Sequence, residues 1–91
     1  MKSLTTPDFW GAYRALAQNV RELARKTYQL WQANPNHPPR QWKLLAPRLW
    51  SIRVGLRYRA PARVRGDTTY WFSIGTHNDF DNIIRRLISG A

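Results

Sequence analysis

The chain has 91 residues and is strongly basic, with 15 lysines and arginines against five acidic residues and a formal net charge of +10. This length suits one domain spanning residues 1–91, and the 13% aromatic content supplies large side chains for a compact core. The absence of cysteine excludes disulfides and thiolate metal sites, and no apolar run approaches the roughly 18 residues of a membrane-spanning helix. No secretory signal is recognisable, so a cytoplasmic location is expected.

The positive charge is concentrated in residues 40–66, which include no acidic side chain. The basic residues of this segment are Arg40, Lys43, Arg48, Arg53, Arg57, Arg59, Arg63 and Arg65. A solvated surface normally mixes charges of both signs, so a segment of one sign favours binding of a polyanion over the alternative of a plain solvated sheet face. Nucleic acid, anionic lipid and an acidic protein are the candidate partners.

The first third of the chain has helical patterning. Thr6-Pro7-Asp8 is typical of a helix start, because threonine caps and proline is tolerated at the first helical position. Apolar side chains recur at helical spacing in residues 9–16 and again in residues 20–31. Two helices, or one bent helix, are therefore predicted before the proline-rich segment 34–39, which is predicted to be a loop.

Beyond this loop the apolar pattern changes to the period of two that indicates β-strands. Antiparallel strands are predicted at residues 50–54, 57–60 and 70–74, with residues 41–46 as a possible fourth and turns at Gly55 and Gly66-Asp67. Thr76-His77-Asn78-Asp79 has a capping-box pattern, and the apolar residues after it recur at helical spacing. The chain is therefore predicted to be α+β and to end in a short helix.

A three-residue loop at residues 55–57 would place Arg53 directly opposite Arg59 on neighbouring strands. Like charges in this position are destabilising unless an anion lies between them, and phosphate is the obvious anion. These two arginines are therefore candidates for a phosphate site.

A second three-residue loop, at residues 65–67, would bring Ser73 beside Arg59 and Thr69 beside Arg63. It would also place Trp71 on the arginine side of its strand, where the indole could stack on a base; burial in the core is the alternative. Both inferred registers are sensitive to a slip of one residue, which would move every side chain to the other face.

From their positions in the sequence, all five acidic residues are expected to have structural roles. Asp8, Asp79 and Asp81 fall in first turns of helices, Glu22 pairs with Lys26 on a helix surface, and Asp67 lies in a turn. No carboxylate pair is left for acid–base chemistry, no ligand cluster suits magnesium or zinc, and no Ser-His-Asp motif is present. Neither a metal nor another cofactor is expected.

The two histidines lie in different segments. His37 belongs to the proline-rich loop and is interpreted as a polar loop residue. His77 follows the last predicted strand, whose alternation points toward the arginine face, so it is a candidate for proton transfer; a polar helix-start residue is the alternative.

Three segments together resemble a known family. Trp50-Ser51-Ile52-Arg53-Val54, then Tyr58-Arg59-Ala60, then Trp71-Phe72-Ser73-Ile74-Gly75-Thr76-His77-Asn78-Asp79-Phe80-Asp81 are similar, in order and spacing, to the pattern of RelE/ParE-superfamily toxins, including HigB-like members. The spacing of Tyr28, Trp31, Pro35 and Lys43 also resembles the helix–loop–strand passage of that family. The resemblance covers nearly the whole chain.

The resemblance implies an N-terminal helical hairpin packed on a three- or four-stranded antiparallel sheet, with a short C-terminal helix. It also implies a type II toxin, which is neutralised by an acidic antitoxin from the adjacent gene and cleaves mRNA at the ribosome without a metal, thereby inhibiting translation. By motif position, Arg53, Arg59 and His77 are the implied catalytic residues. The predicted RNA-binding residues are Lys43, Arg48, Arg57, Arg63, Arg65, Trp71 and Ser73.

Two positions depart from the family pattern. Ser51 stands where ribonuclease members often carry a lysine, and Phe80 stands where many relatives have tyrosine. Groups that could transfer protons are therefore few. Three hypotheses follow from the sequence: an mRNA endoribonuclease, a ParE-like inhibitor of DNA gyrase that does not cleave RNA, and a basic nucleic-acid-binding module without catalysis.

Overall fold

The computed structural model describes residues 2–33, 39 and 41–89. The predicted loop therefore lies largely outside the described residues, as do His37 and Arg40. In chain order the elements are β1 (Lys2–Thr5), α1 (Pro7–Arg14), α2 (Gln18–Ala33), β2 (Trp42–Ala46), β3 (Leu49–Val54), β4 (Tyr58–Arg65), β5 (Thr68–Trp71), β6 (Gly75–Thr76) and α3 (His77–Ser89). The predicted α+β class is confirmed.

Two separate helices lie between β1 and β2 in the chain, but they do not form the predicted hairpin. Thr6 caps α1, and its side-chain oxygen accepts a hydrogen bond from the backbone N–H of Phe9 at 3.2 Å. α1 has only eight residues, and its apolar side chains, like those of α2, pack against the buried cluster of the sheet. Each helix thus packs its apolar side chains on the sheet.

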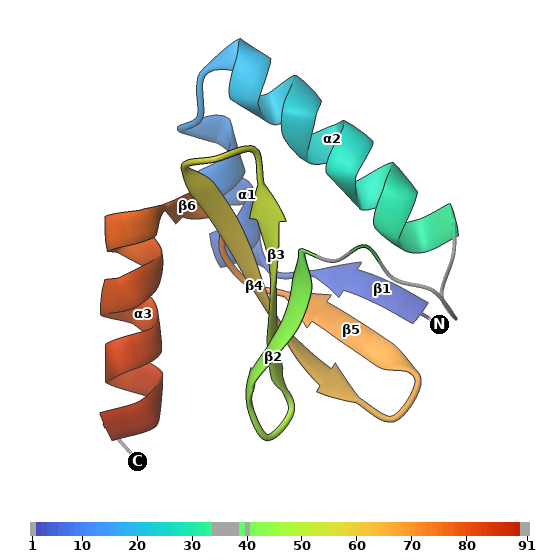
Figure 1. Ribbon diagram of the computed structural model, residues 1–91, viewed down its shortest axis with the longest axis vertical. Coiled ribbons are helices and arrows are strands. Elements are labelled where there is room, and N and C mark those ends of the chain that lie inside the picture. Colours follow the sequence, from blue (N-terminus) through green and yellow to red (C-terminus); the bar gives the residue numbers. More distant parts are fainter. Residues whose placement is uncertain (1, 34–38, 40, 90–91) are drawn as a thin grey trace.

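The sheet is larger than predicted and has mixed strand directions (Figure 1). Its order is β1-β5-β4-β3-β2, and β6 pairs with the start of β4 beyond the end of β5. Strand β1, which the sequence analysis missed, runs parallel to β5. Its four residues are mostly exposed and show no apolar alternation that could have marked them as a strand.

The two hairpins around β4 have loops of different length. The β3–β4 hairpin has the predicted three-residue loop, so Arg53 opposes Arg59 and Val54 opposes Tyr58. The β4–β5 hairpin has a two-residue turn instead, with Arg65 opposite Thr68. Gly66 opens that turn at φ 58°, the positive φ that a two-residue hairpin turn requires. The predicted pairing of Thr69 with Arg63 is therefore wrong.

One face of the sheet carries the core. Buried Trp31 of α2 packs there with Ile52, Val54, Ala60 and Trp71, and tryptophan and tyrosine rings surround this cluster. Figure 1 shows α2 crossing above the sheet on this side. The other face of β3 and β4 carries their arginines, together with the buried residues Leu49, Ser51 and Pro61.

Helix α3 begins with the predicted capping box. The carboxylate of Asp79 accepts hydrogen bonds from the backbone N–H and the hydroxyl of Thr76, and the Thr76 hydroxyl accepts one from the backbone N–H of Asp79. Gly75 lies so close that an added Cβ would meet the Asp79 side chain at 3.0 Å. These contacts attach the start of α3 to β6, and thereby to the start of β4.

The loop glycine Gly55 provides a test of this architecture. Its φ of 64° is unfavourable for other residues, and a Cβ there would lie 2.7 Å from Cδ2 of Leu23 on α2. We expect Gly55→Ala to lower the free energy of unfolding by about 1–2 kcal/mol, chiefly through backbone strain. Gly11→Ala is the matched control, because open space surrounds that helical glycine. It should raise stability by about 0.5–1 kcal/mol in urea unfolding; equal effects would contradict the left-handed loop.

Candidate phosphate-binding site

Alternate residues of the central hairpin project from the face opposite the core. We call Lys43, Arg53, Arg59, Arg63 and Arg65 the basic face; Lys43 pairs in register with Ser51, which alternates with Arg53 along β3. Their neighbours Ile52, Val54, Ala60 and Ala62 are buried on the core side. The strand alternation thus gathers charges of one sign from three adjacent strands.

The cross-strand pair of Arg53 and Arg59 lies at the centre of this face. Register places the two residues directly opposite each other, as predicted, with Arg53 exposed and Arg59 half-buried. In the part of the chain that the structure describes, neither arginine forms an ion pair with a carboxylate. Two uncompensated guanidinium groups at this spacing repel each other and attract an anion.

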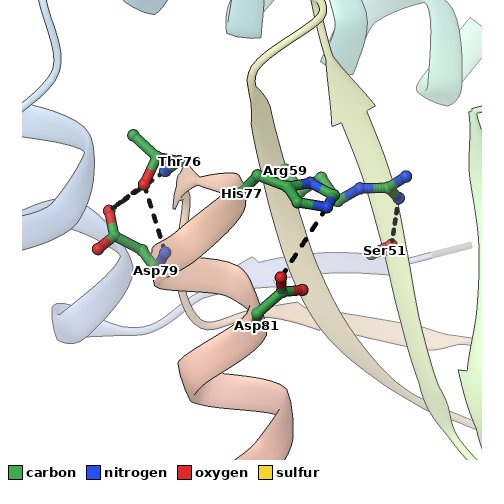
Figure 2. Close-up of polar contacts among 6 residues, drawn as sticks. All are labelled: Ser51, Arg59, Thr76, His77, Asp79 and Asp81. Atoms are coloured by element: carbon green, nitrogen blue, oxygen red, sulfur yellow. Dashed lines mark hydrogen bonds and ion pairs between the residues drawn. The ribbon is translucent and has the colours of Figure 1, made fainter.

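The guanidinium of Arg59 has two further contacts. Its Nη1 donates a hydrogen bond to Oγ of Ser51 at 3.4 Å, and its Cζ lies 5.4 Å from the centroid of the Phe80 ring (Figure 2 shows the first contact). Ser51 is fully buried and Phe80 is 7% exposed. The start of α3 therefore reaches the basic face at Arg59.

His77 lies beside the same aromatic ring. The imidazole and the Phe80 ring have centroids 6.4 Å apart, and the backbone N–H of His77 donates to the carbonyl of Arg57 at 3.0 Å. Its side chain is 63% exposed, and its Nε2 lies 3.9 Å from the Asp81 carboxylate one helical turn later (Figure 2). Phe80 thus contacts both Arg59 and His77, which brings two predicted catalytic residues to one region.

The remaining predicted basic residues are distributed around this centre. Arg63 lies over the ring of Phe72 at 5.7 Å, and Arg65 ends β4. Arg57 is exposed in the β3–β4 loop, and Arg48 is exposed in the β2–β3 turn with φ 64°. These side chains extend the positive surface beyond the hairpin centre.

Two predicted RNA-binding residues do not lie on the basic face. Trp71 is 4% exposed in the core cluster and donates from its indole N–H to Ser3 at 3.0 Å, so stacking on a base is excluded. The two-residue turn shifts β5 by one residue and turns Trp71 to the core side. Gly75, rather than Ser73, pairs with Arg59, and Ser73 lines a separate cleft between α1 and α3.

Three residues near this centre were missed as functional candidates. Ser51 was identifiable from register, because it lies two residues before Arg53 on the same face and diagonal to Arg59. Asp81 was identifiable from its i,i+4 spacing to His77. The contact of Phe80 with Arg59 had no local signal, because it depends on where α3 packs.

An apolar cleft lies on the core side and not at the basic face. It measures about 660 Å³ and is lined mainly by apolar residues of α1, α2 and the sheet. Among the described residues, no group of three or more His, Cys, Asp or Glu side chains could hold a metal ion. None of the helices described is long and apolar enough to span a bilayer.

Comparisons with known proteins reveal a likeness of structure. No family model and no curated protein matches the sequence. A chain of the RelB–RelE antitoxin–toxin complex from Methanococcus jannaschii superposes with a TM-score of 0.70 at 19% identity, covering 88% of this chain and 96% of that one. The YoeB/ParE toxin from Agrobacterium tumefaciens gives 0.66 at 19% identity, covering 85% and 99%. The intact RelBE complex of Escherichia coli gives 0.65 at 18% identity, covering 82% and 94%. The chain therefore has the fold of the RelE and YoeB/ParE toxins.

Proposed function

We propose that this protein is the toxin of a type II toxin–antitoxin system and acts as a metal-independent mRNA endoribonuclease. One observation carries the proposal: the uncompensated Arg53–Arg59 pair lies on the same face as Phe80, which also contacts His77. The motif resemblance and the shared fold support the same assignment.

In this proposal the substrate's own ribose 2′-OH attacks the adjacent phosphate and displaces the 5′-oxygen of the next nucleotide. Arg53 and Arg59 stabilise the negative charge that accumulates on the pentacovalent phosphate. His77 transfers a proton to or from the reacting oxygens. The product is a 2′,3′-cyclic phosphate, and no step requires a metal or another cofactor.

The partners follow from charge. Lys43, Arg48, Arg57, Arg63 and Arg65 would contact RNA phosphates and position mRNA in the ribosome, in the cytoplasm. An acidic antitoxin encoded next to the toxin would cover the basic face and block access to RNA. The RelB–RelE complexes of similar fold support this pairing.

A ParE-like inhibitor of DNA gyrase is the second candidate. The high exposure of His77, whose charged neighbour is Asp81 on its own helix, favours it, as does the similarity in fold to a YoeB/ParE toxin. An inhibitor needs a binding surface but no proton transfer, so these features would not impair it.

Arg59 tests the catalytic assignment. We expect Arg59→Ala to lower mRNA cleavage by roughly 10²-fold or more, because charge stabilisation in the transition state contributes more to rate than to binding. Cleavage of mRNA on programmed ribosomes is the measurement, and the wild-type reaction should continue in EDTA while the ribosome is kept intact. Full activity of Arg59→Ala would remove this site; gyrase inhibition without RNA cleavage would assign the protein to the second candidate.

Substitution of His77 tests proton transfer separately. His77→Gln is expected to lower the cleavage rate, because glutamine keeps a polar side chain but cannot exchange a proton with the reacting oxygens. Single-turnover cleavage on programmed ribosomes is the measurement. A wild-type rate in His77→Gln would place proton transfer elsewhere.

The salt dependence of RNA binding tests the outer part of the basic face. Each phosphate contact releases counterions, giving a slope of about −0.7 per contact in a plot of log K against log salt for single strands. Arg63→Ala is expected to reduce this slope by less than one unit. If salt does not affect binding, RNA binds elsewhere on the protein.

A further inference from the structure

Ser51 is a buried hydroxyl in an otherwise unexplained position. It lies in the middle of β3 opposite Pro61 and has no exposed surface. A buried polar group is costly unless it is hydrogen-bonded, and an apolar side chain would fit a central strand better. The side-chain partner of this hydroxyl, among the described residues, is the guanidinium of Arg59.

Phe80 contacts the same guanidinium from a different element. Its ring, nearly buried at the start of α3, lies 5.4 Å from Cζ of Arg59. A cation over an aromatic face is attracted by the ring quadrupole, more strongly where water is excluded. The guanidinium thus has one contact from a strand and one from a helix, which together restrict it more than one contact could.

Both of these contacts are neutral. A carboxylate would orient an arginine as well, but it would also cancel the charge that a phosphate needs. Arginine has five N–H donors, so the bond to Ser51 leaves most of them for an anion. Among the described residues of the basic face, only Arg59 has both a hydroxyl and an aromatic partner; Arg63 has the ring of Phe72 alone.

We propose that Ser51 and Phe80 are positioning residues, which orient the Arg59 guanidinium toward a phosphate without neutralising it. The identity of that phosphate, the scissile group of RNA, rests on the proposed function. The orientation of Arg59 does not, and can be measured in the free protein.

The kinetic test uses the full chain on programmed ribosomes. Ser51→Ala and Phe80→Leu are each expected to lower the single-turnover cleavage rate about tenfold, the typical effect of one lost contact to a charged group, and to change the RNA dissociation constant less than twofold. In an Arg59→Ala background neither substitution should lower the rate further. Thermal unfolding of each variant identifies loss of folding. Losses that add to that of Arg59→Ala would overturn the proposal.

Phe72→Leu is the matched control for Phe80→Leu, because it removes the ring beneath Arg63 on the same face. Phe72→Leu is expected to weaken RNA binding about twofold, because Arg63 contacts phosphate at the periphery of the basic face. A loss of rate in Phe72→Leu equal to that in Phe80→Leu would show a general effect of aromatic rings, and would contradict positioning.

A second measurement does not depend on activity. Nitrogen-15 NMR of the arginine side chains in the free protein should show slower rotation of the Arg59 guanidinium than of Arg53, and Ser51→Ala should release it. Titration with inorganic phosphate should then show weaker binding to Ser51→Ala than to wild type. If the Arg59 guanidinium rotates slowly but the protein cleaves no RNA, the proposed function is wrong and the positioning of Arg59 by Ser51 and Phe80 still holds. Equal rotation of Arg59 and Arg53 in the wild type would overturn the positioning.

Discussion

The register of the β3–β4 hairpin determines the candidate site. The three-residue loop at residues 55–57 places Arg53 and Arg59 opposite each other and keeps the buried residues Ile52 and Val54 on the other face. Because side chains alternate, a slip of one residue would bury the arginines and expose the core. The same constraint that stabilises the core therefore creates a concentration of positive charge.

The two hairpin loops show what the sequence can and cannot predict. At residues 55–57 both strand faces agreed with one loop length, so the Arg53–Arg59 pair was predictable. At Gly66-Asp67 the tyrosine and tryptophan residues of β5 were acceptable on either face, and the pattern could not decide between two and three loop residues. The core burial of Trp71 follows from that one-residue difference. Gly75 replaces Ser73 opposite Arg59 because the register shifts by one more residue between β5 and β6.

Other features were unpredictable because they depend on contacts between distant parts of the chain. Strand β1 is short and mostly exposed, and forms because β5 offers an edge for parallel pairing. The packing of α1 and α2 on the sheet likewise depends on residues that are distant in the sequence. By contrast, the Thr6 cap and the Thr76–Asp79 capping box are local hydrogen-bond patterns, and both were predicted from adjacent residues.

Two acidic residues at the start of α3 pair with groups other than arginines. Asp79 is held by Thr76 in the cap of α3, and Asp81 lies near His77 rather than an arginine. Arg59 instead contacts an uncharged hydroxyl and a ring. Interactions that would stabilise the isolated chain by neutralising its arginines are thus absent from the centre of the described basic face. The repulsion that remains disfavours the free protein and favours any polyanion that binds there, so the proposed phosphate binding and the proposed acidic partner would have the same physical origin.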